Sequence, residues 1–253
     1  MTGEKYSQPS FMQPLTYLTR RLLRQSKKGA SRPAIATLNA ILTFDCDESP
    51  FGVYNELLAT RLGQMVHIPV ASGVLTVSGD GQTFAGIEAG SHELVMPDIS
   101  DSRLNEVAAK YPSEVAALVA FDLWIGNDDR HGNLKAALHS QHIRIFAGFD
   151  HAISLLGFED DPEKLALRLA ALKSGELLVK FHPFYGLVDG LELSKWVSRV
   201  AGISDDLVIE ACHFGRPFRS VSTAMQSDLA QALVARKRLL PGILAANAAL
   251  IVG

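Results

Sequence analysis

The residues of this chain that are best suited to chemistry lie in one short polar loop and at the end of the run that follows it. The loop reads Gly-Asn-Asp-Asp-Arg-His-Gly-Asn over residues 126–133 and contains two adjacent carboxylates, Asp128 and Asp129, and a carboxamide, Asn133. A third carboxylate, Asp150, ends the largely apolar run downstream. Oxygen atoms of these types are the ligands that Mg²⁺ prefers, and a carboxylate can also orient a hydroxyl and accept its proton. The set predicts a phosphoryl-transfer site that uses a nucleotide and a metal ion.

The spacing of these residues assigns each a role. In protein-kinase-like sites an Asp orients the attacking hydroxyl, an Asn five residues later binds metal, and a further Asp at a strand end bridges metal and phosphate. Asp128, Asn133 and Asp150 match these positions. The plain alternative is a polar turn after a helix, because Gly, Asn and Asp are the usual turn residues. A turn needs one or two of them, whereas this loop has many more, so the functional interpretation is favoured.

The loop and the segment Gly-Phe-Asp-His-Ala-Ile-Ser at residues 148–154 resemble the HipA-like kinases, bacterial relatives of protein and phosphoinositide kinases. The family loop commonly reads Gly-Asn-x-Asp-Arg-His-x-Gly-Asn, and this chain is one residue short between His131 and Asn133. The base is therefore ambiguous: the spacing to Asn133 selects Asp128, and the Asp-Arg-His context selects Asp129. The context is the preferred criterion, since a loop absorbs a one-residue change while neighbouring residues decide which carboxylate points inward. His131 is expected to order the loop.

The resemblance implies a bilobal α+β fold of the protein-kinase type. A small strand-rich N-terminal lobe would occupy residues 1–95 and a larger helical lobe residues 96–253. ATP and Mg²⁺ would bind between the lobes, with Asn133 and Asp150 as the metal ligands. The implied reaction is transfer of the γ-phosphoryl group to a hydroxyl, that of Ser or Thr in a protein.

A helix and the strand before it bear on this activity. The segment that begins Tyr54-Asn-Glu is similar to the family helix that opens with Asn-Glu, and Leu58 and Leu62 recur in it at helical spacing. By resemblance, Glu56 would pair with a phosphate-binding lysine; a Glu in a first turn can also simply stabilise the helix N-terminus. The strand before the helix has Thr43 where the family has that lysine.

Losing this lysine would weaken stabilisation of the transferred phosphoryl group, because a positioned charge in such a site contributes several kcal/mol. The stretch Lys-Lys-Gly-Ala-Ser-Arg-Pro, residues 27–33, stands where the family has its phosphate loop, so Lys28, Gly29 and Ser31 are candidate nucleotide contacts. A solvated turn explains one Gly among basic residues at least as well. Two hypotheses follow: an active kinase, or a pseudokinase that binds nucleotide without turnover.

A rival from another class uses the run Ala-Ile-Leu-Thr-Phe-Asp-Cys-Asp, residues 40–47. It resembles the first motif of haloacid-dehalogenase-type phosphatases, in which Asp45 would be the nucleophile and Asp47 the acid and base. Such enzymes need a doubly wound sheet of alternating strands and helices, and the downstream sequence lacks that alternation.

Composition favours a globular protein of a reducing compartment, which predicts a cytoplasmic location. The chain has 253 residues, of which 47% are hydrophobic and 20% charged, and its two cysteines provide no disulfide framework. A net charge of −3 indicates no general affinity for nucleic acid or anionic membranes. The closing apolar run, residues 243–252, is about half the length that a membrane helix needs and is expected to be a final core helix. The substrate protein and any regulatory partner stay unknown at this level.

The spacing of apolar residues and the positions of Pro and Gly predict the elements that position the site. A helix opens at Pro112 and runs through Trp124, which delivers the polar loop from its C-terminus. A hairpin of two short strands should then present Asp150. The other expected elements are strands at 66–70 and 74–77, hairpin strands near 134–138 and 143–147, a helix between 155 and 182, and helices at 191–200, 205–212 (with Ser204 as its cap) and 225–240.

Overall fold

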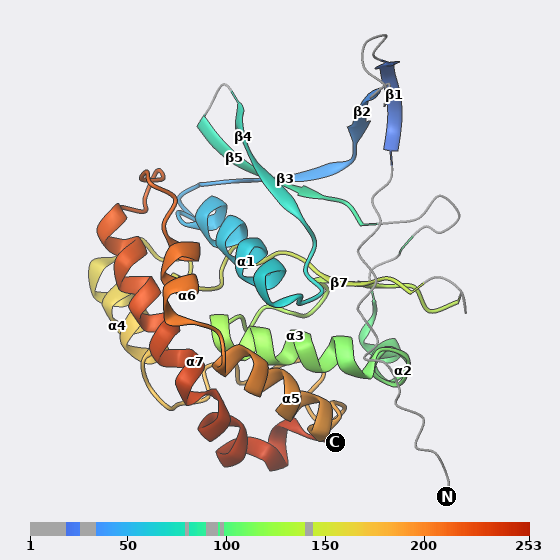
Figure 1. The fold of residues 1–253 in the computed structure, drawn as a ribbon, viewed down its shortest axis with the longest axis vertical. Helices are drawn as coiled ribbons and strands as arrows, with labels where there is room; N and C mark the ends of the chain where they lie inside the picture. The colour runs from blue at the N-terminus through green and yellow to red at the C-terminus, as the bar shows by residue number, and fades with distance from the viewer. Residues whose placement is uncertain (1–18, 26–33, 79–80, 90–95, 97–98, 140–143) are drawn as a thin grey trace, which may run out of the picture.

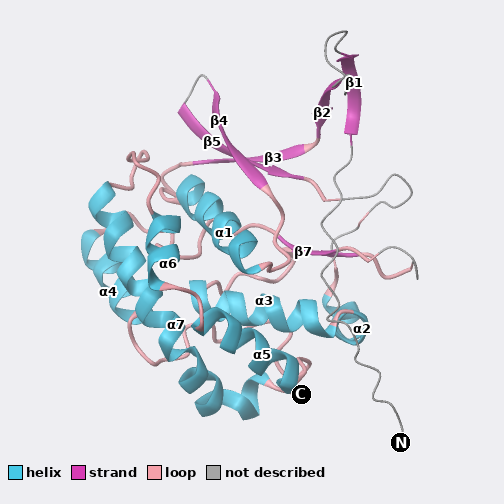
Figure 2. Ribbon diagram, in the orientation of Figure 1, coloured by secondary structure: helices cyan, strands magenta, loops and turns pink. Residues whose placement is uncertain are grey.

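The computed structural model describes residues 19–25, 34–78, 81–89, 96, 99–139 and 144–253. Strands dominate the N-terminal part and helices the C-terminal part, as Figure 2 shows. The predicted α+β class with a small strand-rich lobe and a larger helical lobe is confirmed. The predicted lobe boundary near residue 95 lies outside the described residues.

The N-terminal lobe contains two antiparallel sheets. Strands β1 (Thr19–Gln25) and β2 (Ala34–Leu38) form a hairpin, and β3 (Ala40–Phe44), β4 (Gly73–Ser78) and β5 (Gly81–Ile87) form a sheet in the order β3-β5-β4. Thr43 pairs with Phe84 across the sheet, so both side chains project from the same face. Phe84 is buried at 3% exposure, and helix α1 (Gly52–Val66) packs against this sheet (Figure 1). Thr43 therefore lies on the inner face of the lobe.

Helix α1 follows the predicted pattern, with Leu58 and Leu62 fully buried. It ends at His67, which adopts a left-handed conformation with φ 60°. The strand predicted over residues 66–70 was wrong, because α1 continues through Val66 and Val70 forms only an isolated bridge to Gly148. The alternating apolar residues Val66, Ile68 and Val70 are buried in the last helical turn and in the chain that follows it.

Helix α3 (Pro112–Ile125) is the centre of the C-terminal lobe, and the helix predicted from Pro112 is confirmed. Every residue from Val115 to Ile125 is buried, as expected for a helix that is apolar on all sides. It ends at Gly126, whose φ of 67° favours glycine, so the chain turns sharply into the polar loop.

Helices surround α3, and most of them were predicted. The helix expected over residues 225–240 instead continues to Ile251 and includes the closing apolar run, with Asn247 outside helical geometry. Figure 1 shows α5 and α7 packed along it, with α4 and α6 further out. Ser204 occupies the N-cap position of α6, although its side chain makes no capping hydrogen bond. No helix among the described residues is both long and apolar enough to cross a membrane. The helices of this lobe are α2 (Leu104–Lys110), α4 (Pro162–Leu172), α5 (Gly190–Ala201), α6 (Asp205–Cys212) and α7 (Thr223–Ile251), with a 3-10 turn η1 (Asp101–Arg103) before α2.

The predicted hairpin after the polar loop is present as β6 (Leu134–Ala136) and β7 (Phe146–Gly148). Leu134 pairs with Gly148, and the Phe149 N–H donates to the Asn133 carbonyl over 3.2 Å. Two segments that are separate in sequence, the polar loop and Asp150, are thereby brought together.

The phosphatase alternative is wrong. All strand ladders of the described residues are antiparallel, so the doubly wound parallel sheet is lacking there. The Asp45 carboxylate accepts the Val53 N–H at the start of α1 over 2.8 Å, and the Asp47 side chain is 96% exposed beside Arg219. Asp45 therefore serves as a helix-capping group, which accounts for its position directly after a strand.

Candidate active site

A buried ion pair holds the polar loop in place. Arg130 Nε and Nη2 donate to the two carboxylate oxygens of Asp122 over 2.8 and 2.9 Å, and both side chains are fully buried. Arg130 Nη1 also donates to the carbonyls of Asn133, over 3.0 Å, and Phe149, over 2.7 Å. One guanidinium thus joins helix α3, the loop and the segment that leads to Asp150.

Asp122 accepts hydrogen bonds from several buried side chains besides Arg130. Asn127 Nδ2 donates to it over 3.0 Å, and His182 Nε2 lies 3.0 Å from its other oxygen. Burial acts to raise the pKa of Asp122, but the charge and hydrogen bonds of Arg130 outweigh it and lower that pKa below its usual range. The Phe184 N–H donates to His182 Nδ1 over 3.2 Å, so this nitrogen is unprotonated and the ring is neutral. Burial likewise lowers the pKa of His182.

The structure separates the two candidate bases. Asp128 lines a hollow on the α4 side of the loop together with Phe158 and Arg168, and its charge acts on Arg168. The charge of Asp129 instead acts on Asp150. Asp128 therefore lies at a different site from Asp150, and Asp129 is the carboxylate whose charge reaches Asp150.

Asn133 and Asp150 lie close to Asp129. Asn133 Nδ2 donates to the Asp129 carbonyl over 2.9 Å, a bond that leaves the amide oxygen unused. Asp150 has a left-handed backbone with φ 56°, which is uncommon outside glycine and typical of functional sites. Part of the residue is open to solvent, yet partial burial and then the charge of Glu56 raise the pKa of Asp150, with a further contribution from Asp129. A bound cation would relieve this repulsion among carboxylates.

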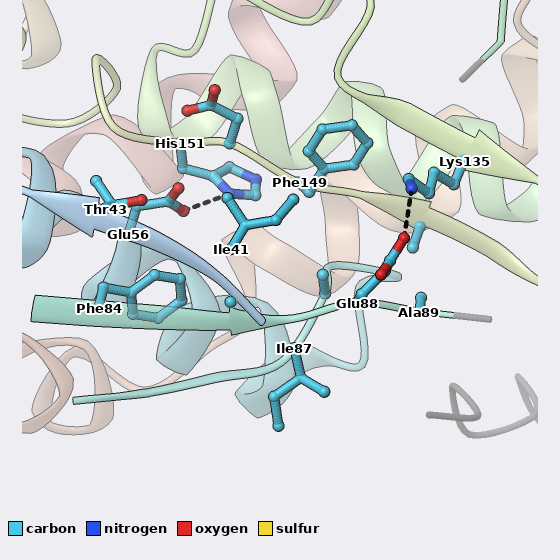
Figure 3. Close-up of a pocket in the computed structure, with 14 residues that line it drawn as sticks. Ile41, Thr43, Glu56, Phe84, Ile87, Glu88, Ala89, Lys135, Phe149 and His151 are labelled. Atoms are coloured by element: carbon cyan, nitrogen blue, oxygen red, sulfur yellow. Dashed lines mark hydrogen bonds and ion pairs between the residues drawn. The ribbon is translucent and has the colours of Figure 1, made fainter. Parts of the chain in front are cut away.

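Two of these carboxylates, Asp150 and Glu56, line a pocket between the lobes, which Figure 3 shows. Its empty volume is about 720 Å³, which includes the part open to solvent. Asp150, Glu56 and Thr43 line it, so the threonine at the expected lysine position does face the pocket. The remaining lining residues are Ile41, Ala71, Phe84, Gly86, Ile87, Glu88, Ala89, Lys135, Ala147, Phe149 and His151.

Glu56 has a different partner from the expected lysine. Its Oε2 lies 3.4 Å from His151 Nδ1, and the two side chains are 7% and 2% exposed. The preceding residue, Asn55, is fully buried and donates to the carbonyls of Ala152 over 2.7 Å and Gly157 over 3.1 Å. The Asn-Glu pair of α1 therefore holds the segment after Asp150.

Three residues hold the segments of the site in place although the sequence predicted no site role for them. They are Asn55, Arg130 and His182. Arg130 lies in the loop 126–133 and Asn55 directly before Glu56, so both belong to motifs with expected site residues. Neither was expected to bind metal or transfer a proton. The signal in the sequence was an arginine inside the carboxylate-rich loop, whose burial and bonding only the structure shows. Nothing in the spacing marked His182, which reaches Asp122 from 60 residues away in sequence.

The ordering role expected of His131 belongs to Arg130. The His131 side chain is 52% exposed, and its Nδ1 lies 3.4 Å from Asp101, which is itself exposed. A surface contact of this kind contributes little to order. Lys28, Gly29 and Ser31, the predicted nucleotide contacts, lie outside the described residues, as do Lys27 and Arg32.

The donors at the Asp150 end suit a hard divalent cation that also binds phosphate oxygens. They are one carboxylate and one amide oxygen, those of Asp150 and Asn133, and Mg²⁺ commonly binds proteins through one or two such groups. Within the described ranges, no three His, Cys, Asp or Glu side chains gather as a metal site. The residues therefore fit a nucleotide-bound Mg²⁺ better than a metal held by protein alone.

No protein-family model matches the chain, and no curated protein sequence does either. Among solved structures, the fold is similar to that of the proinflammatory kinase CtkA of Helicobacter pylori, with a TM-score of 0.57 and 14% identity over 81% of this chain and 94% of that one. HipA of Shewanella oneidensis MR-1, in a complex with HipB and operator DNA, aligns with a TM-score of 0.48 and 15% identity over 84% of this chain and 59% of HipA. The chain therefore shares its fold with a solved bacterial kinase, and the kinase-like fold expected from the loop motifs is confirmed.

Proposed function

We propose that this protein is an ATP- and Mg²⁺-dependent phosphotransferase that transfers the γ-phosphoryl group to a hydroxyl, with a Ser or Thr of a protein as the acceptor. The observation that carries the proposal is the hydrogen-bonded arrangement that places Asn133 beside Asp129 and beside the segment that leads to Asp150, a residue that lines the interlobe pocket. The similarity to a bacterial kinase fold supports the reaction class.

Each residue has a distinct task in this proposal. Asp129 orients the acceptor hydroxyl and takes its proton, while Asn133 and Asp150 hold Mg²⁺ against the phosphate oxygens. The ion would neutralise charge on the phosphates when bound. Arg130 keeps the three in register, because its guanidinium donates to the carbonyl of Asn133 and to that of Phe149, which precedes Asp150.

A second candidate function is nucleotide binding without turnover, and Thr43 favours it. Thr43 lines the pocket at the expected lysine position and has no charge to place against phosphate. Of the described residues that line the pocket, Lys135 is the one Lys or Arg, and it contacts Glu88. Without this charge, we expect turnover to be slower than in kinases that have the lysine, or to be absent.

Thermal denaturation with ATP and Mg²⁺, combined with an assay of ATP consumption, tests both candidates. Asp150→Asn should remove the Mg²⁺-dependent rise in melting temperature, whereas Asp160→Asn, in an exposed loop, should preserve it. Stabilisation without consumption would support the pseudokinase. No Mg²⁺-dependent stabilisation of the wild type would contradict both.

The cellular setting follows from the same reasoning. The proposed cofactors are cytoplasmic metabolites, so we place the protein in the cytoplasm. Its acceptor protein and any regulatory protein partner have no candidate yet, and neither nucleic acid nor a membrane is part of the proposal.

A further inference from the structure

Arg168, on α4, bonds to both of the segments that carry the site residues. Its Nη2 donates to the Gly126 carbonyl over 2.6 Å, and its Nε donates to the Leu155 carbonyl over 2.9 Å. Gly126 is the first residue of the polar loop, and Leu155 is the last residue of the Asp150 segment, by which we mean residues 149–155. The Leu155 N–H also donates to the Ile125 carbonyl over 3.0 Å. One guanidinium therefore joins the start of the loop to the end of the Asp150 segment.

Arg130 makes the same kind of connection at the opposite ends of the two segments. It donates to the carbonyls of Asn133, the last residue of the loop, and Phe149, the first residue of the Asp150 segment. The two segments are thus joined at both ends, each time by one arginine that donates to two carbonyls. Asp129, the proposed base, lies in the loop between the two connections.

The two carbonyls that Arg168 binds belong to residues with an unusual backbone. Gly126 and Leu155 both adopt the left-handed conformation, with φ of 67° and 52°. This conformation is unfavourable for leucine because its Cβ crowds the backbone, so surrounding contacts must hold it. At position 126 a Cβ would lie 2.7 Å from Arg168 Nη2, and the glycine therefore allows the guanidinium to approach. Both turns are matched to this one side chain.

The contacts of Arg168 constrain the backbone and do not neutralise a carboxylate. Within the described part of the chain no carboxylate forms an ion pair with Arg168, whereas Arg130 pairs with Asp122. The charge of Asp128 acts on Arg168 across the hollow that both residues line. Burial lowers the pKa of Arg168, and the two carbonyls and the charge of Asp128 offset the cost of burying the guanidinium.

We propose that Arg168 is a positioning residue for phosphoryl transfer, which holds the start of the loop so that Asp129 stays aligned with the acceptor hydroxyl. The proposal rests on the proposed function. Arg168 does not line the interlobe pocket, and Arg130 holds the ends of the segments that contain Asn133 and Asp150. Loss of Arg168 should therefore slow the chemical step and leave nucleotide binding intact.

Steady-state assays of ATP consumption by Arg168→Ala test this role. The kcat should fall by about 100-fold, because a small displacement of a reacting group has an effect of this size, while the KM for Mg²⁺-ATP stays at the wild-type value. Arg168→Lys keeps a donor for one of the two carbonyls, so its kcat should fall by only about tenfold.

Added guanidinium ion provides a second readout. The hollow beside Arg168 is open to solvent, so the ion can enter the space that Arg168→Ala creates. Guanidinium chloride, far below the concentrations that unfold proteins, should restore part of the kcat of Arg168→Ala. Sodium chloride at the same ionic strength should not, because a sodium ion cannot donate hydrogen bonds to the two carbonyls.

Arg236 provides a matched control. It is a fully buried arginine on α7 that also donates to backbone carbonyls, and these belong neither to the loop nor to the Asp150 segment. Arg236→Ala should lower the melting temperature and keep the kcat of the folded protein. Hydrogen exchange should become faster over residues 126–133 and 150–155 in Arg168→Ala, but not in Arg236→Ala. The carbonyls that Arg236 binds are those of Leu123, Ser174 and Glu176.

The outcomes separate this proposal from the proposed function. Melting temperatures show whether each variant is folded, and Arg168→Lys replaces Arg168→Ala if the latter is not. An unchanged kcat in the folded Arg168 variants, or an equal loss of kcat in Arg236→Ala, would overturn the positioning role and leave the proposed function intact. A rise in the KM for Mg²⁺-ATP at unchanged kcat would overturn it in the same way. Absence of ATP consumption by the wild type would overturn both the phosphotransferase proposal and this one.

Discussion

Glu56 and His151 contact each other in the buried wall of the pocket, with 3.4 Å between Oε2 and Nδ1. The glutamate that the family resemblance assigns to a lysine on β3 thus contacts the residue next to Asp150. Because Asn55 binds the same segment, helix α1 is tied to the Asp150 segment rather than to β3 alone. The absence of a lysine at position 43 therefore does not leave a buried carboxylate without a partner.

Thr43→Lys should strengthen binding of Mg²⁺-ATP by about tenfold or more, because it places a cation in the same pocket as Glu56. Calorimetry measures the affinity, and an ATP-consumption assay shows whether turnover rises as well. Thr76→Lys adds the same charge on β4, outside the pocket lining, and should change neither quantity. Equal effects of the two substitutions would show that net charge, and not position, is responsible.

Asp129→Asn should lower turnover by roughly 100-fold or more, the usual contribution of a positioned general base, with little change in nucleotide affinity. Asp128→Asn should keep turnover within about threefold of the wild type, since Asp128 faces Arg168 and does not contribute to proton transfer. The two variants remove the same charge from adjacent residues, so each controls for the other. The reverse order of activities would identify Asp128 as the base.

Asp122→Asn should lower the free energy of unfolding by about 3–5 kcal/mol, because it leaves the fully buried Arg130 without a counter-charge. Urea denaturation measures this loss. The exposed Arg103–Glu106 pair provides the control, and Glu106→Gln should cost less than about 1 kcal/mol. A small effect of Asp122→Asn would mean that the loop does not depend on this network.

Stability should decrease as the pH falls below 6.5, the ordinary pKa of histidine, partly because of His182. Burial lowers the pKa of His182 in the folded state, so in this range the unfolded chain binds a proton that the folded chain does not. The contribution of one such group approaches about 1.4 kcal/mol per pH unit.

His182→Gln should reduce this dependence while its amide still donates to Asp122. His139→Gln, at an exposed residue, should retain the wild-type slope between pH 7 and about pH 5.5. Urea denaturation over this range measures the slopes. Equal slopes for the wild type and His182→Gln would show that His182 is not the titrating group.

Most of the elements and the reactive residue types follow from local features of the sequence. Helices such as α3, α5 and α6 were predictable because their apolar periodicity, caps and Pro or Gly boundaries are local signals. The loop motif and Asp150 identified the chemistry because metal binding and proton transfer require particular residue types. Local signals failed at residues 66–70, where Val66 ends a helix and the following residues form the chain that leaves it.

Which of these residues act together depends on how separate elements pack. Asp128 and Asp129 are equivalent by composition, and only the direction in which α3 and α4 hold the loop places one towards Asp150 and the other towards Arg168. The contact from Asn55 to Ala152 likewise joins residues 97 positions apart. Spacing along the chain does not encode such contacts, because they form only when separate elements pack around a common core.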